Sequence, residues 1–307
     1  MNAKPLTASG ARTAKKKSLY ASEKWWGYLF VAPPFIGLTV FLLYPLLTSL
    51  YYSFTIFDFS SPPQFVGTEN YKRALFEDPL VWKTLWNTFY AALGVPIGMA
   101  VSLLIAILLN QNLKGKNLFR MLFFLPTICS IVAMTLIWQW IFNSDYGLLN
   151  YFLSLVGIEG PAWLTDETWA MPAMIFQGVW GGLGISIIMY LAALSNVPTS
   201  LYEAATMDGA GGWKKFVHIT VPGISPITFF ILVTSLIAAL QDFPRFVLMT
   251  GGGPNFSTTT IVYYLYTTAF EYNEMGYASA ISWFIGIIIM VIILLNFLLS
   301  KRWVHYN

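Results

Sequence analysis

Charged side chains are scarce in this sequence. Only 10% of its 307 residues are Asp, Glu, Lys or Arg, and 57% are hydrophobic, whereas a soluble globular domain carries roughly 25% charged residues. Six stretches lack charged residues altogether, and each is longer than the roughly 20 residues that a helix needs to cross a bilayer. The six stretches are residues 25–57, 84–113, 121–144, 168–202, 216–241 and 275–300. The sequence therefore predicts an all-α, polytopic membrane protein with six transmembrane helices.

Residues that carry most enzymatic and metal chemistry are also rare. The one cysteine, Cys129, lies within an apolar stretch, which excludes an internal disulfide and a metal site built from cysteines. The two histidines are His218 and His305, and no paired carboxylates occur within a predicted span. The G-x-x-x-x-G-K-[S/T] pattern of an ATP-binding loop is missing. We therefore expect no catalytic residue, no metal ligand and no cofactor in this chain.

Ionisable groups are nearly absent from the middle of the predicted spans. A carrier driven by protons or sodium usually needs such groups near the bilayer midplane. An ATP-independent secondary carrier or channel, and a membrane scaffold, are the alternatives from other classes. The composition favours a protein whose energy source is a separate subunit.

The distribution of Lys and Arg predicts the orientation in the membrane. Positive residues are retained on the cytoplasmic side. With the N-terminus inside, all but four of the 17 Lys and Arg residues fall in inner segments, the exceptions being Lys72, Arg73, Lys83 and Arg245. Both termini are therefore predicted to be cytoplasmic, and the basic run at residues 15–17 is interpreted as a topogenic signal rather than a nucleic-acid site.

The spans and the polar segments between them divide the chain into four parts. Residues 1–22 form a basic cytoplasmic tail that we expect to be disordered, and residues 301–307 form a second cytoplasmic tail. Residues 23–83 hold the first transmembrane helix and its outer loop, and residues 84–300 hold the core of five helices. Within this core, the longest polar interruption is the cytoplasmic loop 200–226.

This cytoplasmic loop contains signals for two short helices. Ser200 and Glu203 match a capping box, which predicts a helix start, and Gly209 is placed to end that helix. A second short helix is expected after the glycine pair at 211–212, and Pro222 would close it before the next span. The small side chains between the ends of the first helix leave a flat surface, so the loop is predicted to be a docking surface.

The fourth predicted span is rich in glycine. Gly178, Gly181, Gly182 and Gly184 occur within seven residues, and a glycine weakens a helix in water by up to about 1 kcal/mol. In a bundle these glycines either permit close packing of a neighbouring helix or bring the backbone next to a ligand path. The sequence leaves both interpretations open.

An acid lies at the end of the fifth predicted span. Burying Asp242 in a membrane would be costly, which makes it a functional candidate. Arg245 follows three residues later, so a local ion pair at the outer interface is the alternative.

Motifs in the loop and in several spans resemble one transporter family. The loop contains Glu203-Ala204-Ala205, Asp208-Gly209 and then Pro222, a pattern similar to the EAA loop of permease subunits of bacterial ATP-binding-cassette (ABC) importers. The wider chain resembles the carbohydrate permeases of type I importers, in the branch of the maltose and oligosaccharide systems. The supporting stretches are residues 122–126 (LFFLP), 140–143 (WIFN), 201–210 (LYEAATMDGA) and 248–254 (LMTGGGP).

The resemblance implies a role for the loop as a coupling helix. In this family the EAA loop sits in a cleft of the ATPase and transmits nucleotide-driven closure to the membrane path. The residues that would couple to the ATPase are Glu203, Ala204, Ala205, Asp208 and Gly209. Glu203 would pair with a basic residue of the ATPase, with the capping box as its alternative role.

The resemblance also implies a substrate path. It falls on Thr127, Ser130, Gly178, Trp180, Gly181, Gly182, Ser235 and Asp242. The sequence departs from the maltose permease pattern at Gly178 and Ala239, where polar amides would be expected. Trp180 beside glycine backbone suits a sugar ring, which has an apolar face and hydroxyl edges; the alternative is a packing or lipid-facing tryptophan.

The implied protein is a permease of the bacterial cytoplasmic membrane that forms half of a path for a sugar or oligosaccharide. Its expected partners are a second homologous permease, two ATPase subunits that bind ATP and Mg, an extracytoplasmic solute-binding protein and membrane lipid, with no nucleic acid. The alternative within transport is the same machinery for a solute of the glycerol-phosphate type.

Overall fold

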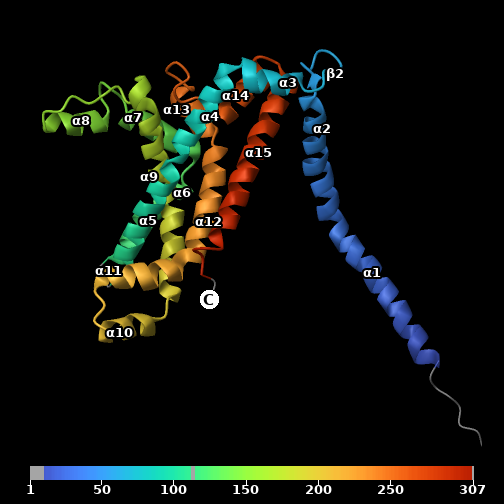
Figure 1. Cartoon of the computed structure of the whole chain (residues 1–307), viewed down its shortest axis with the longest axis horizontal. Coiled ribbons are helices and arrows are strands. Elements are labelled where there is room, and N and C mark those ends of the chain that lie inside the picture. The colour runs from blue at the N-terminus through green and yellow to red at the C-terminus, as the bar shows by residue number, and fades with distance from the viewer. Residues whose placement is uncertain (1–9, 112–114, 306–307) are drawn as a thin grey trace, which may run out of the picture.

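The computed structural model describes residues 10–111 and 115–305. Five helical segments are long and apolar enough to cross a membrane, and a bent pair of helices makes a sixth span. All but the first of these spans stand roughly side by side, with short helices and loops at both ends (Figure 1). The prediction of six spans is confirmed, and the all-α class holds apart from one two-residue hairpin in which β1 (Thr55–Ile56) pairs with β2 (Gln64–Phe65).

The first span extends away from the rest of the molecule. α1 (Gly10–Leu38) continues through a π-helical turn (Thr39–Leu43) into α2 (Tyr44–Ser53). α2 lies beside the N-terminal half of α15 (Met275–Ser300), whereas α1 diverges from every other helix (Figure 1). The prediction of a disordered tail is wrong for residues 10–22, which are helical; residues 1–9 lie outside the described part of the chain.

The second and third spans differ in how they are interrupted. α4 (Pro79–Ala92) and α5 (Gly94–Asn110) form one continuous span. The third span is not the single helix that its apolar composition predicts: α6 (Lys116–Ile128) and α7 (Ile131–Ile141) meet at a 105° bend. Cys129 and Ser130 at the bend have extended backbone, with ψ angles of 145° and 138°, so a short unwound segment lies within the span.

The remaining helices complete the bundle and its two ends. α9 (Glu167–Asn196) is the fourth span, and α12 (Val221–Leu240) is the main part of the fifth. α3 (Glu69–Lys72), α8 (Leu148–Leu155), α13 (Pro244–Thr250) and α14 (Ile261–Tyr266) lie at one end of the bundle, and α10 (Thr199–Met207) and α11 (Gly212–Lys215) lie at the other (Figure 1).

Three clusters of buried apolar side chains hold the bundle together. One joins α4, α14 and α15, the second joins α5, α9 and α12, and the third joins α7, α9 and α13. α5 packs along α9, where a Cβ at Gly94 would lie 3.3 Å from Cγ2 of Ile175. Small residues therefore allow close helix contact here, as expected in a membrane bundle.

Asp78 links three helices at the end of the bundle where α14 lies. Its Oδ1 accepts a hydrogen bond from the backbone N–H of Leu80 (2.9 Å) and caps α4. Its Oδ2 accepts hydrogen bonds from the hydroxyls of Tyr264 (2.6 Å) and Tyr277 (2.7 Å). Burial and the adjacent carboxylate raise the pKa of Tyr264, so its hydroxyl stays a donor.

We expect the Asp78→Ala substitution to destabilise the protein by roughly 2–4 kcal/mol, because it removes a helix cap and leaves two buried hydroxyls unpaired. Thermal unfolding of the detergent-solubilised protein measures this loss. The control is Glu69→Ala, which breaks an exposed ion pair with Lys72 (2.8 Å) and should cost no more than about 1 kcal/mol. Equal unfolding temperatures for the two variants would show that Asp78 has no such role.

Candidate functional site

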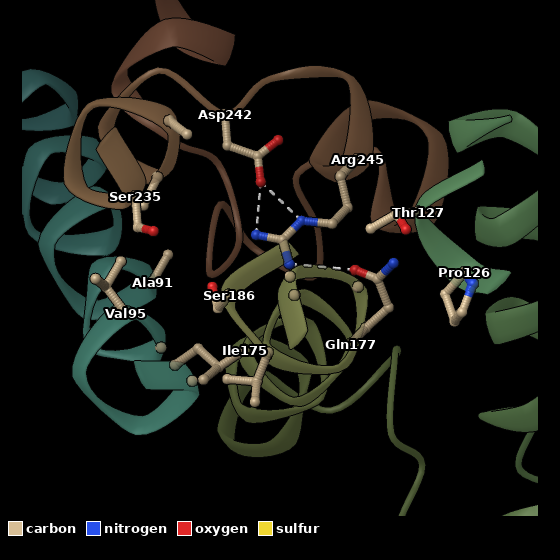
Figure 2. A pocket seen from close by; sticks show the side chains of 18 of the residues that line it. Ala91, Val95, Pro126, Thr127, Ile175, Gln177, Ser186, Ser235, Asp242 and Arg245 are labelled. Carbon is tan, nitrogen blue, oxygen red and sulfur yellow. Dashed lines mark hydrogen bonds and ion pairs between the residues drawn. The ribbon is translucent and has the colours of Figure 1, made fainter. Parts of the chain in front are cut away.

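A cavity of about 510 Å³ opens halfway along the spans. Its walls come from four places in the chain: the α4–α5 span, the bend between α6 and α7, the middle of α9, and the end of α12 with the segment that follows (Figure 2). Among the described residues, α2 and α15 contribute nothing to the lining. The cavity therefore lies on the side of the bundle away from those two helices.

The bend between α6 and α7 supplies one wall. Pro126 lies inside α6 and has no N–H to donate to the helix. Thr127 and Cys129 line the cavity, and the Thr127 hydroxyl donates to the carbonyl of Phe124. Irregular backbone inside a membrane is tolerated where it lines a cavity or is covered by protein, and this bend lines the cavity.

The glycine-rich run of α9 serves both of the purposes that the sequence left open. A Cβ at Gly184 would lie 2.6 Å from the carbonyl oxygen of Phe123, so this glycine allows α6 to pack against α9. Gly181 and Gly182 line the cavity and have no atom within 4 Å of the Cβ position, apart from their chain neighbours and the backbone of their own helix. A Cβ at Gly178 would overlap Nη1 of Arg245 and lie 2.8 Å from its Cζ.

Arg245 connects the segment after α12 to α9. Its Nε and Nη2 donate to Oδ2 of Asp242 (2.7 and 2.6 Å), and its Nη1 donates to the carbonyl of Met174 (2.8 Å) and to Oε1 of Gln177 (3.2 Å). The guanidinium lies between the carboxylate and the amide (Figure 2). The side chains of Arg245 and Asp242 are only 12% and 19% exposed. The local ion pair that the i,i+3 spacing indicates is therefore present, and it lies in the cavity wall.

Most of the predicted substrate-path residues lie around this cavity. Two do not: Ser130 is exposed at the bend but is not part of the lining, and Trp180 meets the ring of Trp138 edge-on with centroids 6.4 Å apart. The packing interpretation of Trp180 therefore matches its position. Those that line the cavity are Thr127, Gly178, Gly181, Gly182, Ser235 and Asp242.

Three polar lining residues were absent from the sequence-based set: Gln177, Ser186 and Arg245. Gln177 and Ser186 lie on α9 on either side of the glycine run, about two and a half turns apart. Helical periodicity therefore places them on opposite faces and would not have predicted that both line the cavity. Arg245 follows Asp242 by three residues, and its position after an apolar run predicts the outer interface rather than the cavity. The guanidinium can lie in the cavity wall because Gly178, which is distant in the sequence, has no side chain to occupy that space.

The loop 200–226 lies at the end of the bundle opposite α8 and α13 (Figure 1). Glu203, Ala204, Asp208 and Gly209 are exposed on α10 and the turn after it, and Ala205 is half-buried. Met207 is 88% exposed. Among the residues that the structure describes, Glu203 makes no ion pair and no side-chain hydrogen bond, so its carboxylate is available to a partner.

Two local predictions for this loop need correction. α10 begins at Thr199 after Pro198, and no side chain caps it; Ser200 is already inside the helix, so the capping box does not form. Pro222 does not close a second short helix either, because α11, a π-helical turn and α12 form one continuous helix from Gly212 to Leu240. Pro222 lies inside this continuous helix, just after the π-helical turn Phe216–Thr220. Gly209 does adopt the left-handed conformation (φ 75°) just after α10.

The loop is held against the bundle by polar contacts. The hydroxyls of Tyr202 and Thr220 are 2.9 Å apart, and Nζ of Lys215 donates to Oγ1 of Thr206 (2.8 Å). α10 is thus fixed to the start of the fifth span while its outer surface stays exposed.

Comparisons with known proteins identify the family. The chain is 38% identical over 307 aligned residues to a probable ABC transporter permease, YesP, of Bacillus subtilis (98% of this chain, 99% of the relative). It is 36% identical over 298 residues to the arabinooligosaccharide permease AraP of the same organism (96% and 93%). Two structures of a bacterial ABC transporter that imports alginate match at 25% identity, with TM-scores of 0.81 and 0.80.

The structural matches cover almost the whole chain: 94% and 92% of this chain, and 99% and 96% of the matched chains. The second of these structures is a complex with a periplasmic protein bound to an alginate pentasaccharide. The fold is thus that of the membrane subunit of an ABC importer. The model of the family described as "binding-protein-dependent transport system inner membrane component" matches residues 94–304, and the chain therefore belongs to that family.

Proposed function

We propose that this chain is the permease subunit of an ATP-driven importer of a sugar or oligosaccharide, and that it forms half of the translocation path. The observation that carries the proposal is the combination of a cavity within the spans that has polar side chains in its wall and an exposed EAA helix at one end of the bundle. No ATP-binding loop occurs in the sequence, so the energy comes from a separate ATPase that binds ATP and Mg.

The path residues are those of the cavity, and the coupling residues are those of α10. The chemistry of the lining suits an uncharged polyol better than a phosphate ester. Its guanidinium, Arg245, already donates to Asp242, Gln177 and the carbonyl of Met174, so it is not free to bind a phosphate. This favours a carbohydrate over a solute of the glycerol-phosphate type.

The assembly consists of this chain, a second homologous permease, two ATPase subunits and a solute-binding protein. The position of the cavity on one side of the bundle supports pairing with a second permease across that side. The names of the relatives, which include an arabinooligosaccharide permease, and the structure with a sugar-bound periplasmic protein support delivery of a sugar by a binding protein. Both termini and α10 face the cytoplasm, where the ATPases bind.

Co-purification and sugar binding test this proposal. A tagged chain extracted from its native membrane should bring down a second permease and an ATPase. The partner solute-binding protein should then bind at least one member of a panel of lactose, arabinotriose, maltotriose, raffinose and trigalacturonate. Isolation of the chain alone, with transport in vesicles without ATP, would contradict the proposal and favour a secondary carrier.

A further inference from the structure

The guanidinium of Arg245 lies directly against the backbone of Gly178, in the space that a side chain at position 178 would fill. We call this contact the seat of Arg245, and the family resemblance does not explain it. A polar amide would be expected at position 178, yet the sequence has glycine there. The structure contains an amide one residue earlier, on Gln177, and the space above Gly178 is filled by the guanidinium of Arg245. No side chain larger than hydrogen fits at position 178 while the guanidinium stays in place.

The guanidinium fixes one oxygen of each of two cavity residues and leaves the other polar atom of each unused. Asp242 accepts through Oδ2 and Gln177 through Oε1. Within residues 10–111 and 115–305, Oδ1 of Asp242 and Nε2 of Gln177 make no hydrogen bond, and both side chains line the cavity. Asp242 and Gln177 thus present one acceptor and one donor to the cavity, each on a side chain whose other polar atom is held by Arg245 (Figure 2).

This pair of groups matches the chemistry of a sugar. Each hydroxyl can donate to a carboxylate oxygen and accept from an amide N–H. A charge-assisted hydrogen bond to a carboxylate is stronger than a neutral one. The binding geometry then depends on the side chains that hold these groups in place.

We propose that Arg245, seated on Gly178, is a positioning residue that orients Asp242 and Gln177 toward a carbohydrate in the cavity. This inference rests on the proposed function. Asp242 and Gln177 contact the sugar, whereas Arg245 and Gly178 act on it only through them. Arginine is required because one planar group donates in three directions, which the point charge of a lysine cannot reproduce. Arg245→Lys should therefore not restore the function.

A double-mutant cycle tests the seat itself. Gly178→Ala adds one methyl group that overlaps the end of a flexible side chain, so it moves the guanidinium without unfolding the helix. We expect Gly178→Ala and Arg245→Ala each to lower ATP-driven sugar uptake at least about tenfold. Because the methyl group acts only through the guanidinium, the double variant should match Arg245→Ala within about twofold. Uptake lowered by the product of the two single effects would overturn the proposal.

The unique cysteine gives a readout that a purely structural role would not move. Cys129 is exposed, free and part of the cavity lining, so a sugar in the cavity should slow its reaction with a thiol reagent in proteoliposomes. The probe is the panel sugar that the partner binding protein binds best. Gly178→Ala and Arg245→Lys should raise the half-protecting sugar concentration at least about tenfold. Unchanged protection in both variants would overturn the proposal.

The matched control is Gly286→Ala on α15, where a Cβ meets no atom within 4 Å outside its own helix and immediate neighbours. It makes the same chemical change in a span that does not line the cavity, and uptake and protection should stay at wild-type levels. A wild-type complex that transports no sugar would contradict the proposed function. A wild-type complex that transports sugar while Gly178→Ala behaves like Gly286→Ala would contradict this inference alone.

Discussion

Replacing Glu203 by alanine is expected to lower ATP-driven uptake at least about tenfold while the chain still inserts into the membrane at wild-type amounts. Glu203 is exposed on α10, and within the described part of the chain its carboxylate makes no ion pair. Its charge therefore contributes nothing to the fold of this subunit. At an interface, truncation of one partner of a hydrogen-bonded charge pair costs roughly 2–5 kcal/mol, which corresponds to a loss of affinity of about 30-fold or more.

The control for Glu203 is Ser200→Ala. A capping box would make both residues necessary for the helix start, but α10 begins after Pro198 without a side-chain cap. Ser200→Ala should therefore leave uptake unchanged. Wild-type uptake in Glu203→Ala would contradict the coupling role. An equal loss of uptake in Ser200→Ala would show that Glu203 acts by capping the helix.

The second large effect is expected at Gly184, where α6 and α9 pack most tightly. In Gly184→Ala the new Cβ would lie 2.6 Å from the carbonyl oxygen of Phe123, 3.2 Å from Cα of Phe124 and 3.3 Å from Cγ2 of Thr127. Two of these atoms belong to the backbone, so the helices must separate. Overpacking of this kind costs typically 1–3 kcal/mol, and we expect the unfolding temperature to fall by roughly 2–12 °C.

Gly286→Ala is again the matched change, because its Cβ would enter open space. Alanine is favoured over glycine within a helix, so this variant should be as stable as the wild type or more stable. The two substitutions are thus expected to act in opposite directions on the same measurement. A Gly184→Ala protein as stable as Gly286→Ala would show that α6 and α9 do not pack as described.

The loop and the cavity are connected by the two helices that flank the loop. α9 carries Gln177 and Gly178 in the cavity and ends at Asn196, just before α10. α12 carries Ser235 and continues without a break from the start of α11. A displacement of α10 by an ATPase would therefore be transmitted to two cavity walls at once, which is how a docking event at one end can reshape a path in the middle.

The spans could be predicted from the sequence because charge is excluded from each of them. The bend in the third span could not be located, because residues 121–144 contain no charge and Pro126 lies inside α6 rather than at the bend. Ser200 and Glu203 match a capping box with Ser200 as the N-cap, yet the N-cap of α10 is Pro198, two residues earlier. The position of Arg245 in the cavity wall could not be predicted from its neighbours in sequence, because the space for its guanidinium is left by Gly178, 67 positions earlier in the chain.

Uptake by the reconstituted complex tests whether this chain is the permease subunit of an ATP-driven sugar importer. Proteoliposomes would contain this chain, its partner permease and the ATPases, with the sugar-loaded binding protein outside and ATP within. We expect sugar accumulation that requires both ATP and the binding protein and that falls at least about tenfold with Glu203→Ala. Accumulation without ATP, or by vesicles that contain this chain alone, would contradict this assignment.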